Sequence, residues 1–274
     1  MKRSRITVVV DNASAPPLAK EFGLSLLVEI SGDTVLFDTG AGNALPVNFE
    51  HLCPEPGRIG KVVLSHGHYD HTGGLSWAMP RLPKAELYLA PGIFKRRFSR
   101  HGEGDIHEIS MPDACVRAVD SHLLKHEVSE FTEIADGMFL TGPIPRISGE
   151  DCGGDFFFDP ECRSRDAVCD EQALLLGGGV LIQGCCHAGI INTIEYCRRM
   201  KPDIRIRTVI GGLHLLHADG DRMAETVKYL NDSGIEKLVA LHCSGDEAVE
   251  FLKRELSGSG CEVATGAAGD TFNE

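Results

Sequence analysis

The segment Ser65–Gly74 reads Ser-His-Gly-His-Tyr-Asp-His-Thr-Gly-Gly, and four of its side chains can bind a metal ion. These four are His66, His68, Asp70 and His71. The segment directly follows the apolar run Val62–Leu64, which is typical of a buried strand, so we expect the ligands on a loop at the end of that strand. A solvated histidine-rich loop is the alternative, but a His-x-His-x-Asp-His pattern behind a buried strand favours metal binding.

One tetrahedral ion cannot take four ligands from six consecutive residues without severe strain. In an extended loop, alternate side chains point the same way, so His66 and His68 can reach one ion while Asp70 and His71 reach a second. Imidazole and carboxylate ligands together suit zinc, manganese or iron. The sequence therefore predicts two divalent transition-metal ions, with zinc preferred and manganese or iron as alternatives.

Two more histidines follow expected strands later in the chain. His187 stands in the sequence Gly-Cys-Cys-His-Ala-Gly after the apolar run Val180–Ile182, and His242 follows the run that ends at Leu241. Either histidine alone is equally well explained as a core or capping residue. Two of them at equivalent strand-to-helix junctions favour further metal ligands, because α/β folds gather ligands at such junctions.

Short apolar runs and glycine-marked turns predict a single α/β domain over residues 1–274. The expected strands are Ile6–Val10, Leu24–Ile30, Thr34–Phe37, Lys61–Leu64, Met138–Leu140, Ala173–Leu176, Val180–Ile182, Ile204–Ile210 and Lys237–Leu241. The expected helices are Asp221–Asn231 and one that a Ser244–Glu247 capping box opens, with an apolar stripe of Val249, Leu252 and Leu256. Residues 91–172 are the least regular, and we interpret them as insertions and loops over one face.

Further motifs accompany the histidine pattern. They are Phe37–Gly40, Leu140–Arg146, Asp170–Leu174, Gly184–Gly189, Gly211–Leu215 and His242–Gly245. With them the whole chain resembles the metallo-β-lactamase-fold hydrolase superfamily, and in particular the branch named for 7,8-dihydropterin-6-methyl-4-(β-ribofuranosyl)aminobenzene-5′-phosphate synthase. The resemblance implies an αββα four-layer sandwich with a dinuclear site in the cleft at the sheet edges.

The resemblance also implies a division of the ligands between the two ions. His66, His68 and His187 hold one ion, and Asp70, His71 and His242 hold the other. The superfamily usually has an earlier histidine on a separate loop and a bridging aspartate after a glycine-ended strand. Here no such histidine is evident near Thr141, and Cys185 stands where that aspartate falls. Cys185 therefore either bridges the ions or packs beneath the site.

Two other residues each have a functional and a structural interpretation. Asp38, in Phe-Asp-Thr-Gly, either orients a ligand histidine as a second-shell acceptor or forms a turn after a buried strand. His214, after the Gly211–Gly212 turn, either contacts the substrate or is a structural histidine.

Charge and composition limit the partners. Lys and Arg total 27 against 40 Asp and Glu, a net charge of −13, which disfavours a nucleic-acid partner because such binding depends on neutralising phosphates. The basic run Lys95–Arg97 with Arg100 is expected to be a solvated helix face, with steering of an anionic substrate as the alternative. No apolar run approaches a membrane span, and Ile6–Val10 is too short for a signal peptide, so we expect a cytoplasmic protein.

The ten cysteines are expected to be reduced thiols or metal ligands rather than a disulfide framework. Cys152, Cys162 and Cys169 lie in an acidic, glycine-rich stretch and lack the tight Cys-x-x-Cys pairing of a cluster or structural zinc site, so we interpret them as free thiols.

The expected function is that of a metallohydrolase. A hydroxide activated by two metal ions attacks a small ester, lactone or phosphoester, with an anionic substrate as one option. Asp70 is the catalytic candidate, because it can bind metal and also take up a proton. The alternatives are a synthase that joins a pterin to an aminobenzene ribotide with release of pyrophosphate, and a metal- or redox-sensing protein. The sequence does not specify the oligomeric state.

Overall fold

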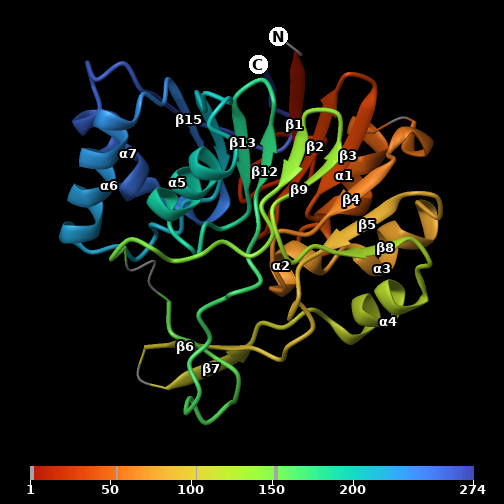
Figure 1. The fold of residues 1–274 in the computed structure, drawn as a ribbon. Helices are drawn as coiled ribbons and strands as arrows, with labels where there is room; N and C mark the ends of the chain where they lie inside the picture. The colour runs from red at the N-terminus through yellow and green to blue at the C-terminus, as the bar shows by residue number, and fades with distance from the viewer. Residues whose placement is uncertain (1–2, 54, 103, 151–153) are drawn as a thin grey trace.

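Two seven-stranded sheets lie face to face at the centre of the molecule, and helices cover the outer face of each (Figure 1). The structure, a computed structural model, describes residues 3–53, 55–102, 104–150 and 154–274. The arrangement is the αββα four-layer sandwich that the sequence predicts.

The first sheet has the strand order β17-β1-β2-β3-β4-β5-β8. Its strands are β1 (Ser4–Val10), β2 (Ser25–Ile30), β3 (Asp33–Phe37), β4 (Lys61–Val63), β5 (Glu86–Leu89), β8 (Lys125–Glu127) and β17 (Thr271–Asn273). Strands β17, β1, β2 and β3 pair antiparallel, and β3, β4, β5 and β8 pair parallel. The turn after Ile30 joins β2 to β3 in an antiparallel hairpin.

The second sheet has the order β16-β15-β14-β13-β12-β10-β9. Its strands are β9 (Thr132–Ala135), β10 (Met138–Leu140), β12 (Leu174–Leu176), β13 (Val180–Gln183), β14 (Thr208–Gly211), β15 (Lys237–Ala240) and β16 (Glu262–Thr265). The strands from β9 to β13 pair antiparallel, and those from β13 to β16 pair parallel. Strand β14 begins four residues later than the expected strand Ile204–Ile210. Ile206 is buried in the core but belongs to no strand.

Three hydrophobic clusters separate the four layers. One lies between the sheets, and the other two lie between each sheet and its helices. On β13, Val180 and Ile182 point into the cluster between the sheets while Leu181 points into the cluster under the helices. Alternate residues of a strand face opposite sides of the sheet, so strands covered on both faces read as continuous apolar runs. This burial explains why the strands could be found in the sequence.

The helices divide between the two outer layers. Helices α1 (Ala44–Leu52), α3 (Leu75–Ala78) and α4 (Asp113–Ser121) pack on the first sheet, and α5 (Ile190–Met200), α6 (Gly220–Ser233) and α7 (Asp246–Glu255) on the second. The short α2 (Tyr69–Thr72) follows β4, and single 3-10 turns span Pro56–Arg58, Met79–Arg81 and His242–Ser244. None of the described helices is long and apolar enough to cross a membrane.

Helix α7 has the predicted apolar stripe but begins differently. Val249, Leu252 and Leu256 are buried as expected. The predicted capping box is wrong, because Gly245 is the N-cap and makes no side-chain hydrogen bond. The Ser244 hydroxyl instead donates to the Leu241 carbonyl at 2.7 Å.

Residues 91–172 are more regular than the sequence suggests. They contain a small third sheet of order β11-β6-β7, made of β6 (Phe98–His101), β7 (Asp105–Glu108) and β11 (Phe156–Phe157). Its β6 and β7 lie below the sandwich in Figure 1, and the same region supplies α4, β8, β9 and β10 to the main layers. All four residues of β7 are exposed, so this strand lacks the apolar alternation that reveals strands in a sequence.

Candidate metal centre

The candidate ligands gather where strands of both sheets end. Within three residues of the ends of β3, β4, β13, β14 and β15 stand Asp38, His66, Cys185, His214 and His242, respectively. His68 is the residue just before α2, and Asp70 and His71 lie within it. Five strand ends therefore deliver the polar side chains to one place, as is usual for α/β folds.

His66, His68 and His187 form the first ligand group. Their ligand atoms lie within 4.8 Å of one another, and all three side chains are buried. The Nε2 atoms of His66 and His68 and both ring nitrogens of His187 have no hydrogen-bond partner in the described chain. Buried polar atoms are nearly always paired, so three converging imidazoles with unpaired nitrogens fit a metal ion.

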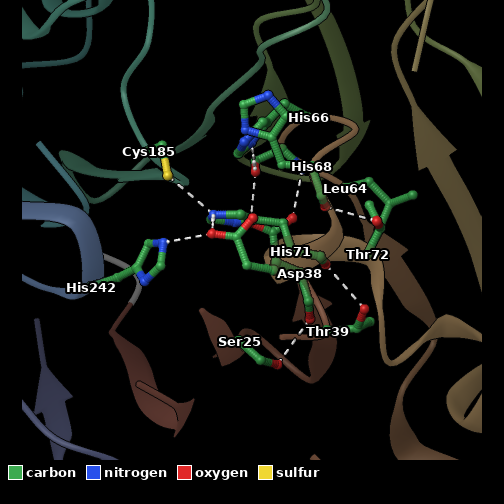
Figure 2. Close-up of polar contacts among 12 residues, drawn as sticks. Ser25, Asp38, Thr39, Leu64, His66, His68, His71, Thr72, Cys185 and His242 are labelled. Atoms are coloured by element: carbon green, nitrogen blue, oxygen red, sulfur yellow. Dashed lines mark hydrogen bonds and ion pairs between the residues drawn. The ribbon is translucent and has the colours of Figure 1, made fainter. Parts of the chain in front are cut away.

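Asp70, His71, Cys185 and His242 form the second ligand group, again with ligand atoms within 4.8 Å of one another. Here the side chains bond to each other. His242 Nε2 lies 3.1 Å from Asp70 Oδ2, and His71 Nε2 lies 3.1 Å from Cys185 Sγ, as Figure 2 shows for His71 and Cys185. Two imidazoles, a carboxylate and a thiol are also a donor set that fits a transition-metal ion.

Asp38 lies behind both groups. Its Oδ2 accepts a hydrogen bond from His71 Nδ1 at 2.7 Å (Figure 2). It accepts another from the Ser65 hydroxyl at 2.6 Å. Because the Ser65 hydrogen points to Asp38, the Ser65 oxygen is left to accept from His66 Nδ1 at 2.9 Å. One carboxylate thus turns the Nε2 atoms of His66 and His71 toward the two groups, as second-shell carboxylates do at metal sites. A Cβ at Gly184 would lie 2.2 Å from Ser65 Oγ, so glycine is needed there.

The electrostatics differ between the groups. Burial, together with neighbouring histidines, holds the pKa values of His66, His68 and His187 well below the usual value, so these rings are neutral, as metal binding requires. Burial lowers the pKa of His71, but the carboxylates of Asp38 and Asp70 outweigh it and raise that pKa to about 9. Burial raises the pKa of Asp70, yet His71 and His242 bring it below its ordinary value, so the carboxylate stays ionised.

Several residues at the site adopt left-handed backbone conformations that non-glycine residues rarely take. The φ angles are 57° at Asp38, 64° at Cys186, 49° at His214 and 48° at His242. Such conformations cost about 1–3 kcal/mol each and cluster at functional sites. His214 and His242 line the cavity, and Asp38 and Cys186 stand next to candidate ligands or hold them, so these conformations support a functional role for this edge of the molecule.

Three consecutive residues hold the loops of the site; the sequence placed them in the motif Asp170–Leu174 but gave them no individual role. Asp170 accepts from the Gly67 amide at 2.9 Å, and Glu171 accepts from the His187 amide at 2.6 Å. Gln172 donates to the Leu64 carbonyl at 2.8 Å. Burial raises the pKa of Glu171 to about 7. The sequence feature that could have revealed this role is a run of three polar residues directly before a buried strand.

The basic run does not form the solvated helix face that the sequence predicts. Arg97 is only 1% exposed, and its guanidinium lies 2.6 Å from Asp170 and 2.8 Å from Asp166. Arg96 and Arg100 are exposed. The segment leads into β6 rather than a helix, which turns Arg97 inward beneath the loop that carries His66 and His68.

A cavity of about 300 Å³ opens over both groups. Its lining includes His68 and His187 from the first group and Asp70, Cys185 and His242 from the second. The ring of Phe156, on β11, lies 5.1 Å from that of His68 and 5.3 Å from that of His187, so the small third sheet covers the site. His214 also lines the cavity, with its ring 4.4 Å from that of His187.

The family model for the metallo-beta-lactamase superfamily matches residues 19–163. The chain belongs to the metallo-β-lactamase superfamily. Tm1679, a metal-dependent hydrolase of the beta-lactamase superfamily, is 32% identical, and the match covers 98% of both chains with a TM-score of 0.82. The predicted superfamily and fold are thereby confirmed.

Two further proteins are similar to this chain at lower sequence identity. A 7,8-dihydropterin-6-methyl-4-(beta-D-ribofuranosyl)-aminobenzene-5′-phosphate synthase of Methanocaldococcus jannaschii is 27% identical, over 88% of this chain and 86% of that protein, in agreement with the predicted branch resemblance. Zn²⁺-bound PqqB of Methylobacterium extorquens is 15% identical with a TM-score of 0.60, over 98% of this chain and 99% of that one, and it shares the fold.

The cysteines of this chain differ in their surroundings. Cys185 lies in the second ligand group, whereas Cys186 is buried in the cluster under the helices, 3.8 Å from the Thr193 hydroxyl. Cys162 and Cys169 are at least partly exposed and belong to none of the ligand groups formed by the described residues. Cys152 lies outside the described residues.

Proposed function

We propose that this protein is a metal-dependent hydrolase that binds two divalent transition-metal ions, zinc by preference, and cleaves a small ester, lactone or phosphoester. The proposal rests on one observation: two groups of buried ligand atoms share one cavity. His66, His68 and His187 hold one ion, and Asp70, His71 and His242, with Cys185, hold the other. When bound, such ions polarise an electrophilic oxygen and lower the pKa of water, so that hydroxide is available near neutral pH.

The side chains of the protein contribute orientation and proton transfer. Asp38 fixes His71 directly and His66 through Ser65, so the Nε2 atoms of both imidazoles face the ligand groups. Asp70 stays ionised, and a carboxylate has two oxygens, so one can bind an ion while the other accepts a proton from the attacking water. The ring of Phe156 lies against His68 and His187 and limits the access of bulk water to the first group.

The cavity supports a small substrate with an anionic group. Phe22, Ile109, Phe156 and Leu216 give it an apolar wall. Arg222 also lines it, is only 9% exposed, and has an Nε atom without a hydrogen-bond partner among the described residues. Its Nη2 makes one long contact of 3.4 Å to the Leu213 carbonyl. A buried guanidinium with unused donors suits a carboxylate or phosphate of the substrate.

The second candidate function is that of the synthase, which the relative from Methanocaldococcus jannaschii favours. In that case the site would join a pterin to an aminobenzene ribotide with release of pyrophosphate. The cavity of about 300 Å³ lies at the lower end of the range for ligand pockets, which supports one small hydrolase substrate over two condensing ones.

A substrate screen after metal reconstitution separates the two functions. The protein loaded with zinc, manganese or iron is offered phosphodiesters, lactones and thioesters, and separately the pterin pyrophosphate with the aminobenzene ribotide. Hydrolysis that His68→Ala removes supports the hydrolase. Pyrophosphate release that requires both synthase substrates would support the second candidate instead. A protein that takes up none of the three metals would overturn both.

A further inference from the structure

A third group of metal-binding side chains lies beside the two described above. Its members are Cys185, His214 and Cys243, and their ligand atoms lie within 4.8 Å of one another. They follow the ends of β13, β14 and β15, three neighbouring parallel strands of the second sheet. We propose that Cys185, His214 and Cys243 form a separate site for a thiophilic divalent ion such as Cd²⁺ or Zn²⁺.

The backbone makes room for this group. A Cβ at Gly212 would lie 2.5 Å from Cys243 Sγ and 3.2 Å from the Cα of Cys185, so any side chain there would displace the sulfur. His214 has a strained backbone φ of 49°, and the residue lines the cavity. The Nδ1 atom of His214 is buried and has no hydrogen-bond partner in the described chain. The group thus contains a ring nitrogen without a hydrogen-bond partner, and the glycine at position 212 leaves room for the Cys243 sulfur.

The donor set selects a different ion from the other two groups. Two sulfurs and one imidazole are soft ligands, which favour Zn²⁺, Cd²⁺ or Cu(I) over Mn²⁺. Three protein ligands leave the fourth tetrahedral position for a group from the cavity that all three line. The Cys243 thiol contacts the Cys185 carbonyl at 3.5 Å, and metal binding replaces that contact and releases each thiol proton to solvent.

Cys185 connects the third group to the second. Its sulfur lies 3.1 Å from His71 Nε2 and also belongs to the cluster with His214 and Cys243. A thiolate has lone pairs for two ions, so Cys185 can bridge an ion in the second group to one in the third. Cys243 and His214 are therefore the members that distinguish the third site, because neither belongs to the other two groups.

Cadmium binding tests the proposal. We would measure bound Cd²⁺ by equilibrium dialysis and elemental analysis, and follow the ultraviolet absorption from thiolate-to-cadmium charge transfer. The wild-type protein is expected to bind one equivalent more than Cys243→Ser or His214→Gln. Cys243→Ser should also lose about half of the charge-transfer absorption, because one of two thiolate ligands is gone. Circular dichroism checks that each variant is folded. If Cys243→Ser does not fold, the result for His214→Gln decides the test.

Two controls make the result specific. Cys186→Ser removes the adjacent thiol, which packs under the helices, and should keep the wild-type stoichiometry and absorption. His68→Ala should lose an ion of the first group but keep the thiolate absorption, so failure of the proposed dinuclear site is distinguishable from failure of the third site. Unchanged stoichiometry and absorption in both Cys243→Ser and His214→Gln would overturn the proposal.

Discussion

The two proposed ion sites are built from similar residues, but their ligand atoms differ in whether they have hydrogen-bond partners. In the first group, the Nε2 atoms of His66 and His68 and both nitrogens of His187 have no partner among the described residues. In the second group, His242 contacts Asp70 and His71 contacts Cys185, each at 3.1 Å. A bound ion would therefore satisfy buried nitrogens in the first group, whereas the side chains of the second group already bond to one another.

This difference predicts unequal affinities. An ion entering the first group meets neutral imidazoles and displaces no hydrogen bond that the protein makes. An ion entering the second group must displace the contacts of Asp70, His71 and Cys185, and also the proton that His71 holds because its pKa is raised to about 9. We therefore expect the first group to bind its ion more tightly than the second, by an amount that grows as the pH falls below 9.

The largest expected effect comes from removing one ligand from each group. His68→Ala should lose one equivalent of zinc, His242→Asn should lose one, and the double variant should lose two, by elemental analysis. Asparagine suits position 242 because it tolerates the left-handed backbone there. Activity should fall in each single variant by more than the roughly 100-fold that second-shell changes cost. His51→Ala, an exposed histidine at the end of α1, is the control and should match the wild type. Single variants that retain full metal content would contradict the two-group assignment.

The fold was largely predictable because buried strands and helices have recognisable local patterns of apolar residues. The inner strands of both sheets are buried on both faces, and α7 has its apolar stripe where the sequence places it. Local patterns failed where tertiary contacts decide. Ile206 is as apolar as a strand residue but packs without pairing, and the exposed β7 has no apolar pattern. Ser244 has the residue type of a cap but bonds to Leu241 instead.

The site was predictable where its residues lie close in sequence. The His-x-His-x-Asp-His pattern indicated four candidate ligands, and strand-end positions indicated His187 and His242, which the structure brings beside them. The supports of the site lie far away in sequence. Arg97 and Asp170 are 73 residues apart, and neither has a local pattern that reveals the ion pair. Contacts of this length depend on the whole fold, so a single sequence does not disclose them.

The next largest effect concerns the support under the first group. Arg97→Met leaves the buried carboxylates of Asp166 and Asp170 without their cation, and Asp170 also holds the Gly67 amide between His66 and His68. Removing one partner of a buried ion pair costs roughly 3–5 kcal/mol of the free energy of unfolding. Urea denaturation of the metal-free protein measures this loss. Arg96→Ala, which breaks an exposed pair with Glu108, is the matched control and should unfold like the wild type. Equal stability of both variants would show that the buried pair contributes little.

A smaller effect is expected from Asp38, which orients histidines of both groups. Asp38→Asn keeps the size of the side chain and tolerates the φ of 57°, but the neutral amide holds His71 less firmly. The affinity for the second ion should fall roughly 10–100-fold, with a smaller loss for the first ion, as is typical of second-shell changes. Ser65→Ala breaks the link between Asp38 and His66 but leaves the contact of Asp38 with His71, so it should weaken mainly the first ion. Competition with a chromophoric chelator measures both constants. A variant Asp38→Asn that binds both ions normally would show that Asp38 only forms the turn after β3.

The smallest effect separates two neighbouring thiols. Cys185 lies 3.1 Å from His71 in the second group, whereas Cys186 points to the other side of the strand end, into the cluster under the helices. Cys185→Ser should weaken the binding of the second ion without abolishing it, because Asp70, His71 and His242 remain as ligands. A serine hydroxyl is a harder and weaker ligand for zinc than a thiolate, so activity should fall in parallel with affinity. Cys186→Ser should change neither quantity. If Cys185→Ser also leaves both unchanged while His187→Ala removes the first ion, Cys185 packs beneath the site, and the second group binds through its two histidines and Asp70 alone.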